Sequence, residues 1–293
     1  MKISRRDFLK WSVATAVALN LELDMDRVNT VLAADTDPPV IWLNGSGCSG
    51  CTISTLNVTN PTTIDDVLLN KISMKYNTTL MTASGDSAIQ TLDECANTYN
   101  GQFILVVEGA IPTGISGNYC IIGEQNGIPL TMQQAVLKYG PMAKYVIAAG
   151  TCASFGGVSA AAPNNTSCQS VQSVLSGKTV NPVISISGCP VHPTITIQTL
   201  LDLILTGMPT LDNYSRPRQY YNNIHSNCPR RGKTQVNQPG IFGCYRAIGC
   251  NGPGCSNVCP SMKWNNGTNW CVESNHPCIG CANPGFPTSP LTI

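Results

Sequence analysis

Cysteine constrains this chain more than any other residue type, because 15 of its 293 residues are cysteines. Disulfide scaffolds are usually much shorter, and an odd number leaves at least one cysteine unpaired. So many cysteines in a long chain favour metal ligation. Charged residues make up only 11% and hydrophobic residues 42% of the chain, with 17 basic and 16 acidic side chains. The composition excludes a disordered chain and a nucleic-acid binder held by net positive charge.

Residues 1–34 read as an export signal. Arg5 and Arg6 precede an apolar run, Trp11 to Leu21, that is too short to span a bilayer. This order is typical of a twin-arginine signal, whereas a basic amphipathic helix would show a periodic polar face. We expect a periplasmic mature protein without a transmembrane anchor, in which twelve basic and twelve acidic residues remain.

Residues 35–210 alternate apolar runs with helix-favouring segments. The expected strands are Val40–Leu43, Leu80–Thr82, Phe103–Val107, Tyr145–Ala149 and Val183–Ile186. The expected helices are Ile64–Ile72, Asp86–Tyr99, Met132–Tyr139, Gln169–Leu175 and Thr194–Leu205. This alternation predicts an α/β domain with a parallel sheet that is covered on both faces. Ligands of such sheets lie beyond the carboxyl ends of the strands.

Four cysteines follow the ends of three expected strands. Cys48 and Cys51 form a C-x-x-C pair after the first strand, and Cys152 and Cys189 follow two later strands. We call these four cysteines the first set. Four thiolates at one edge of a sheet suit an iron–sulfur cluster or a zinc ion. A thioredoxin-like redox pair is the alternative for Cys48 and Cys51, but it leaves the other two unexplained.

Residues 211–293 contain no long apolar run, and they hold eight of the cysteines. A segment that buries so little apolar surface needs staples, which metal clusters would provide. The second set is His225, Cys228, Cys244 and Cys250. One imidazole with three thiolates fits zinc, the commoner choice on spacing alone, or an iron–sulfur cluster. The third set is Cys259, Cys271, Cys278 and Cys281.

The remaining cysteines belong to none of the three sets, and they are Cys95, Cys120, Cys168 and Cys255. We expect them to be small buried residues or surface thiols.

The order of these motifs resembles the small, electron-transferring subunit of periplasmic nickel–iron hydrogenases, over about residues 39–287. The landmarks of the resemblance are Trp42–Gly45 before Cys48, Val107–Thr113, Gly150–Ala153, Gly188–Pro193, Ile224–Pro229, Gly249–Pro253, Trp264–Gly267 and Pro277–Cys281. Any single C-x-x-C would be weak, whereas so many landmarks in one order are specific.

The resemblance implies a flavodoxin-like domain with a proximal 4Fe–4S cluster on the first set. A loop-rich iron–sulfur domain would follow, with a distal 4Fe–4S cluster on the second set and a medial 4Fe–4S or 3Fe–4S cluster on the third. The nickel–iron centre would belong to a separate large subunit, so no residue of this chain is expected to be catalytic. Electrons would pass to an external acceptor, for which we expect a c-type cytochrome, and no nucleic acid is expected as a partner.

Two other interpretations remain. A quinone-reductase subunit related to respiratory complex I would share the first domain, but it leaves the cysteine-rich half and the export signal unexplained. The alternative from another class is an exported zinc- or disulfide-stapled binding protein.

The sequence departs from the family at informative positions. Cys271 stands after Asn269-Trp270, where many members have proline, so it would complete a medial 4Fe–4S site as in the nickel–iron–selenium type, or else be a bystander. Gly50 and Gly157 stand where oxygen-tolerant members carry extra cysteines. We therefore expect an ordinary, oxygen-sensitive proximal cluster.

Several polar residues lie near these sets. We expect His192 to make a structural hydrogen bond and Glu108 to make hydrogen bonds at a subunit interface. Arg230, Arg231 and Lys233 follow Cys228. They either compensate the negative charge of thiolate-bound clusters or steer an acidic electron acceptor to the second set.

Overall fold

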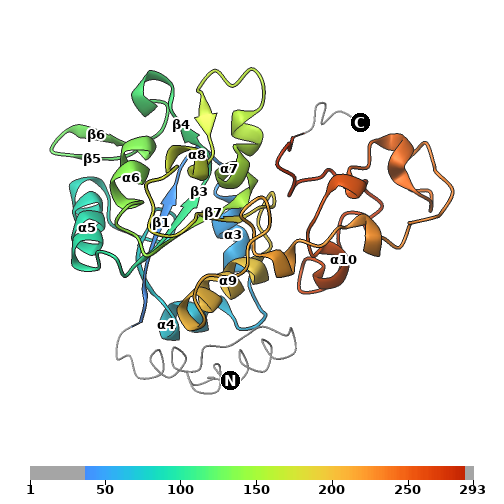
Figure 1. Cartoon of the computed structure of the whole chain (residues 1–293), viewed down its shortest axis with the longest axis horizontal. Helices are drawn as coiled ribbons and strands as arrows, with labels where there is room; N and C mark the ends of the chain where they lie inside the picture. Colours follow the sequence, from blue (N-terminus) through green and yellow to red (C-terminus); the bar gives the residue numbers. More distant parts are fainter. Residues whose placement is uncertain (1–36, 288–293) are drawn as a thin grey trace.

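The computed structural model describes residues 37–287 (Figure 1), so the export signal lies outside the described residues. Its main sheet contains β1 (Pro39–Asn44), β2 (Ser73–Asn77), β3 (Ile104–Glu108), β7 (Tyr145–Ala149) and β9 (Ile184–Ile186). The strand order is β2-β1-β3-β7-β9, and every neighbouring pair is parallel. This is the flavodoxin-like order, which confirms the expected α/β fold class.

Helices cover both faces of the sheet because its strands are apolar on both sides. Along β1, Val40 and Trp42 belong to one hydrophobic cluster, and Ile41 and Leu43 to the other. The first cluster is covered by α4 (Ile64–Asn70) and α9 (Pro193–Leu205). The second is covered by α5 (Gly85–Thr98), α6 (Met132–Tyr139) and α8 (Val171–Val174).

The edge of the sheet differs from the expectation. Leu80–Thr82 was expected to be a strand but lies in a turn and a loop, and Leu80 is 40% exposed. The edge strand is β2 instead, where Lys75 interrupts the apolar pattern that marks the central strands. β-Propensity predicts an edge strand poorly, because such a strand needs a packing partner on one side only.

Two small sheets were not foreseen. β4 (Ile111–Pro112) pairs with β8 (Cys168–Gln169). Gln169, expected to begin the helix Gln169–Leu175, therefore lies in a strand, and α8 begins at Val171. β5 (Ile121–Gln125) and β6 (Ile128–Thr131) form a hairpin around Asn126-Gly127, and both turn residues have positive φ. An Asn-Gly turn is a strong hairpin signal, so the sequence did carry this information.

Short elements replace long ones after α9. They are η3 (Arg218–Tyr220), η4 (His225–Asn227), η5 (Tyr245–Ile248), η6 (Gly252–Gly254) and α10 (Cys259–Met262). Trp270, Val272 and Ala282 nevertheless belong to the same hydrophobic cluster as α9. The loop-rich part is thus packed against the sheet domain through a shared core. Within residues 37–287, no helix combines the length and apolarity needed to cross a bilayer.

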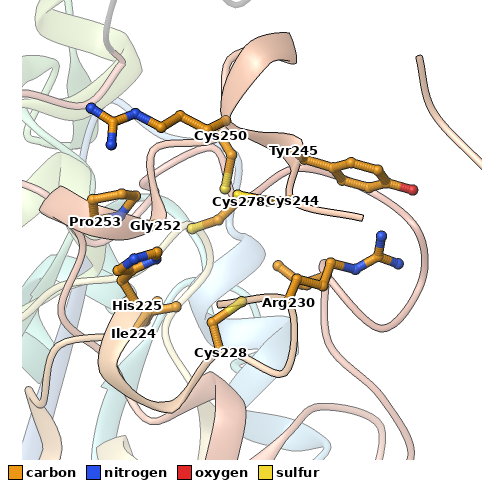
Figure 2. A pocket seen from close by; sticks show the side chains of 12 residues that line it. Ile224, His225, Cys228, Arg230, Cys244, Tyr245, Cys250, Gly252, Pro253 and Cys278 are labelled. Carbon is orange, nitrogen blue, oxygen red and sulfur yellow. The ribbon is translucent and has the colours of Figure 1, made fainter. Parts of the chain in front are cut away.

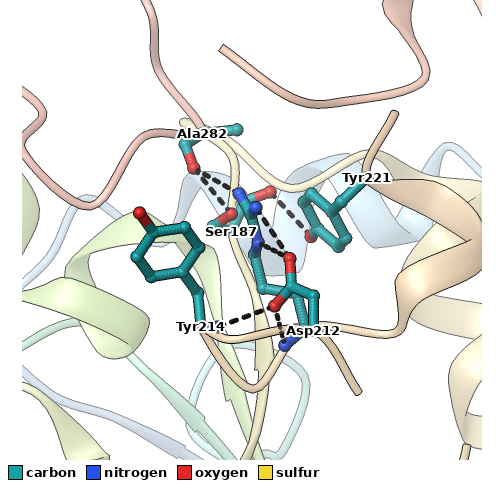
Figure 3. Close-up of polar contacts among 6 residues, drawn as sticks. Ser187, Asp212, Tyr214, Tyr221 and Ala282 are labelled. Carbon is teal, nitrogen blue, oxygen red and sulfur yellow. Dashed lines mark hydrogen bonds and ion pairs between the residues drawn. The ribbon is translucent and has the colours of Figure 1, made fainter. Parts of the chain in front are cut away.

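A partly buried ion pair lies where the two parts meet (Figure 3). Arg216 contacts Oδ2 of Asp212 through Nε and Nη2, both at 2.8 Å, and its Nη1 donates to the carbonyl oxygen of Ala282 at 3.2 Å. Ser187 donates to the same oxygen at 2.8 Å, and the Tyr221 hydroxyl donates to the carbonyl of Ser187. We call these residues the Arg216 clamp. It fixes Ala282 beside the loop that follows β9.

Candidate metal centres

The structure gathers the first set at the carboxyl edge of the sheet. Cys48 lies in the loop after β1, and Cys51 lies in the first turn of α3 (Gly50–Leu56). Cys152 lies in α7 (Gly150–Phe155), directly after β7, and Cys189 follows β9. Electrostatic interactions couple Cys51 to Cys152 and Cys189, and Cys189 to Cys48. Three loops therefore present four thiols to one another.

The surroundings of the first set fit a cationic core bound by thiolates. Burial raises the pKa of Cys51 well above its usual value and that of Cys189 to about 11, so these sulfurs need a bound metal to ionise. Glycine, which has no side chain, leaves room beside these sulfurs. A Cβ on Gly150, whose φ is +92°, would lie 2.5 Å from the sulfur of Cys51.

Glu108 holds the first C-x-x-C pair in place. Its carboxylate is only 3% exposed and accepts hydrogen bonds from the backbone N–H of Cys51 and of Thr52, at 2.9 and 3.0 Å. It also accepts from the Thr52 hydroxyl and, at 3.0 Å, from Nε1 of Trp42. The expectation of interface hydrogen bonds was wrong, because these donors within the chain engage both carboxylate oxygens.

The second set surrounds a hollow. His225, Cys228, Cys244 and Cys250 all line it, and it opens to solvent (Figure 2). The ligands come from η4 and from the loops on either side of η5. The donor set, three thiols and one imidazole, fits an iron–sulfur cluster with one histidine ligand.

Arg230 lines the same hollow, but it is buried. Its guanidinium donates to the carbonyl of Gly243 at 3.0 Å and to Oδ1 of Asn275 at 2.6 Å, and it lies 4.3 Å from the ring centroid of Tyr245. Arg230 therefore ties three loops together, and the idea that it steers an acceptor was wrong. Arg231 and Lys233 are exposed.

The third set is also brought together. Electrostatic interactions couple Cys281 to Cys259, Cys271 and Cys278, and burial raises the pKa of Cys281 to about 12. Cys271 is the exposed member of this set. Cys255, which sequence analysis left outside every set, is 1% exposed and interacts with the side chain of Cys278. No spacing pattern in the sequence indicates this contact.

Single hydrogen bonds connect the three sets in order. The backbone N–H of Cys189 donates to the sulfur of Cys281, which links the first set to the third. The backbone N–H of Cys278 donates to the sulfur of Cys250, which links the third set to the second. The pair Cys278 and Cys281 is thus the structural bridge between the two outer sets.

The other assigned residues can also be placed. His192 makes the expected structural hydrogen bond, from Nε2 to the carbonyl of Lys263 at 2.6 Å. All fifteen cysteines lie within the described residues, and each is a free thiol, which speaks against a disulfide-stapled protein. Cys95 and Cys168 are buried, and Cys120 is half-buried. Within residues 37–287, no three His, Cys, Asp or Glu side chains lie close enough to ligate a single metal ion.

Comparisons with known proteins identify the family. Residues 48–203 match the family model of the NADH ubiquinone oxidoreductase 20 Kd subunit, and residues 220–292 match the model for the C-terminal part of NiFe/NiFeSe hydrogenase small subunits. The periplasmic [NiFeSe] hydrogenase small subunit of Desulfomicrobium baculatum is 36% identical, over 98% of this chain and 97% of the relative. This chain is a nickel–iron hydrogenase small subunit.

Other relatives agree. The periplasmic [NiFe] hydrogenase small subunit 1 of Nitratidesulfovibrio vulgaris is 37% identical over 97% of this chain and 90% of its own length. A structure of the reduced, active Ni-Fe-Se hydrogenase from Desulfomicrobium baculatum has a TM-score of 0.82 at 37% identity, covering 86% of this chain and 96% of that chain. Residues 2–21 match the twin-arginine signal family, so the small subunit is exported to the periplasm. It is the electron-transfer subunit of a hydrogenase.

In this chain, a side chain at Gly157 is expected to crowd Cys152. The φ of Gly157 is +52°, and an added Cβ would lie 2.9 Å from the backbone of Cys152 and 3.0 Å from its sulfur. We expect Gly157→Ala to displace Cys152 and to lower the iron content of the purified protein. Gly177→Ala is the control, because that glycine also has positive φ but has open space around it. Equal iron in both variants would contradict the steric argument.

Proposed function

We propose that the small subunit relays electrons between a nickel–iron centre on a large partner subunit and an external acceptor through three iron–sulfur clusters. Cys48, Cys51, Cys152 and Cys189 would hold the proximal 4Fe–4S cluster. His225, Cys228, Cys244 and Cys250 would hold the distal 4Fe–4S cluster. Cys259, Cys271, Cys278 and Cys281 would hold the medial cluster. Iron–sulfur clusters supply one-electron storage, and the protein's role is to ligate, space and insulate them.

The observation that carries this proposal is the order of contacts between the sets. Cys189 contacts Cys281, and Cys278 contacts Cys250, each through one N–H to sulfur hydrogen bond. Three sets in series, with the second beside an opening to solvent, suit a relay from a buried partner site to a soluble acceptor. A zinc-stapled binding protein would need no such series.

The medial site is where the family varies. Cys271 interacts electrostatically with Cys278 and Cys281, which supports a fourth thiolate and a 4Fe–4S cluster of the nickel–iron–selenium type. An added thiolate increases the negative charge of the site, so it should make this cluster harder to reduce. The competing form is a 3Fe–4S cluster on Cys259, Cys278 and Cys281, with Cys271 as a bystander.

Iron and acid-labile sulfide per anaerobically purified heterodimer, with low-temperature EPR on the same sample, test the proposal. The nickel–iron centre adds one iron to the count. Beyond that iron, about twelve per small subunit and no oxidised 3Fe–4S signal would support Cys271 as a ligand. About eleven with that signal would keep the relay and make Cys271 a bystander. Zinc or disulfides in place of iron would refute the relay.

We further propose that the acceptor is an acidic protein such as a c-type cytochrome. Charge reversal at Arg231 and Lys233, which are exposed beside Cys228, should slow reduction of the acceptor at low salt, because opposite charges speed the encounter. Stopped-flow kinetics at two salt concentrations measures this rate. Charge reversal at Lys178, an exposed residue of the sheet domain, is the control. A rate that is equally slow in both variants, or unchanged in both, would argue against steering at this site.

A further inference from the structure

A polar cavity of about 330 Å³ is lined by no member of the three ligand sets. It lies where the loop after α3 and the first turn of α9 meet the end of α10 and the loop that follows α10. Ligand pockets in proteins range upward from about 300 Å³, and they combine apolar walls with a few placed polar groups. This cavity is therefore large enough for a ligand of monosaccharide size.

His192 brings an acceptor without a donor to the wall of this cavity. The residue is only 4% exposed. Its Nε2 lies 2.6 Å from the carbonyl oxygen of Lys263, which can only accept, so Nε2 carries a proton. Burial lowers the pKa of the imidazole, which favours the neutral ring and leaves Nδ1 as an acceptor. Within residues 37–287, Nδ1 has no hydrogen-bond partner. A ligand O–H or N–H would remove the cost of this unsatisfied atom.

The rest of the wall offers hydroxyl and amide groups rather than charges. Among the described residues that line the cavity, only Lys263 has a charged side chain, and its ammonium lies 3.2 Å from a carboxylate oxygen of Glu273. Four asparagines line the cavity, together with the hydroxyls of Thr59, Thr194 and Ser261. Because amides and hydroxyls both donate and accept, they can exchange hydrogen bonds with the O–H groups of a polyol.

Trp264 adds an apolar surface to the wall. Its ring meets the imidazole of His192 edge-on, with 4.9 Å between the ring centroids. Its backbone N–H donates to the carbonyl of Asn269 at 2.7 Å, and its own carbonyl accepts from the N–H of Thr268 at 2.9 Å. The indole is therefore held in place, where it can pack against the C–H groups of a ligand.

The backbone on this side of the cavity is strained. Lys263, Asn265 and Asn266 have φ values of +54°, +52° and +57°, which residues with side chains rarely adopt. The Thr59 hydroxyl donates to Oδ1 of Asn266 at 2.9 Å and connects this loop to the loop after α3. Strained backbone concentrates at ligand sites, where the surrounding structure holds it in place. The strain therefore agrees with a binding role for the cavity.

We propose that this cavity binds a neutral, polyhydroxylated small molecule of monosaccharide size. One O–H of the ligand would donate to Nδ1 of His192, and its ring carbons would lie against Trp264. An anion is disfavoured because Glu273 already compensates the charge of Lys263. A cation is disfavoured because no carboxylate is found among the described residues of the wall. The proposal does not depend on the iron–sulfur relay, since it uses none of the proposed ligands.

Isothermal titration of the intact heterodimer with glucose tests the proposal. We expect saturable binding in the millimolar range. Thr194→Val removes one lining hydroxyl at nearly constant shape and should weaken binding roughly 2- to 10-fold, the loss of one neutral hydrogen bond. Thr194→Phe fills the cavity and should abolish binding. Thr91→Val makes the same change at an exposed position of α5 and should leave the affinity unchanged.

A variant of His192 examines the acceptor itself. His192→Phe keeps a ring beside Trp264 but has no acceptor nitrogen, so it should also lose binding. Because it loses the hydrogen bond to Lys263 as well, its thermal unfolding midpoint is recorded with the titration. Wild-type heterodimer that shows no saturable heat with glucose or with sorbitol would overturn the proposal, and water alone would then satisfy Nδ1. Equal glucose affinity in wild type and Thr194→Phe would overturn it too, because the sugar would then bind elsewhere.

Discussion

Replacing Glu108 by alanine is expected to empty the proximal site and to destabilise the sheet domain. The variant would leave the backbone N–H groups of Cys51 and Thr52 and the indole N–H of Trp42 without their acceptor. Each buried donor that loses its partner costs roughly 1–3 kcal/mol. Since two of them begin α3, the turn that carries Cys51 should lose its fixed position.

The measurement is iron per heterodimer together with the thermal unfolding midpoint. Glu108→Gln keeps one acceptor oxygen and should lose less of both quantities than Glu108→Ala. Glu124→Ala is the matched control, because Glu124 is exposed on the β5–β6 hairpin. Wild-type iron content in Glu108→Ala would mean that the carboxylate does not position the first set.

The second large effect is expected at the Arg216 clamp. Arg216→Met keeps much of the side-chain volume, but it leaves the half-buried Asp212 carboxylate without its cation and removes one of the two hydrogen bonds to the carbonyl of Ala282. Breaking a fully buried ion pair by removing one partner costs about 3–5 kcal/mol, and the loss here should be smaller because Asp212 is partly exposed. Because Ala282 follows Cys281, the loss should loosen the medial site before the sheet unfolds.

Thermal unfolding of the heterodimer and the medial EPR signal, recorded side by side, would show this order. Arg218→Met is the control, since Arg218 is exposed and only two positions away. A midpoint for Arg216→Met that matches the control would show that the clamp contributes little to stability. Asp212→Asn with Arg216→Met should recover part of the loss, because no unpaired charge remains buried.

The fold and the position of the first set could be predicted from the sequence for one physical reason. Continuous apolar strands require a parallel sheet, and a parallel sheet brings its carboxyl ends together, so Cys48, Cys152 and Cys189 had to meet. The apolar pattern did not reveal β2, because an edge strand needs packing on one side only and β2 contains Lys75. The sequence also did not predict the burial of Arg230, because its hydrogen-bond partners, the carbonyl of Gly243 and Asn275, belong to other loops.

The contact between Cys255 and Cys278, like that between Trp264 and His192, could not be predicted from the sequence for a related reason. Cys255 has no C-x-x-C partner, and Trp264 lies in a tight loop whose orientation depends on His192, which is distant in sequence. Motif spacing reports which residues are near in the chain, whereas these contacts depend on how α9 and the loop-rich part share a core. The same cause explains why Glu108 was misread as an interface residue.

The bridge between Cys281 and the sheet also bears on when the protein can become complete during synthesis. Thr151, the neighbour of Cys152, donates its hydroxyl to the carbonyl of Cys281, 130 positions later in the chain. Chains emerge from the ribosome with their earlier segments first, so the strands can pair while the carboxyl edge still lacks this partner. A nascent chain therefore lacks this contact at its first ligand site until residues near 281 have been translated. Translation that stops short of them would release a sheet with its ligand edge open.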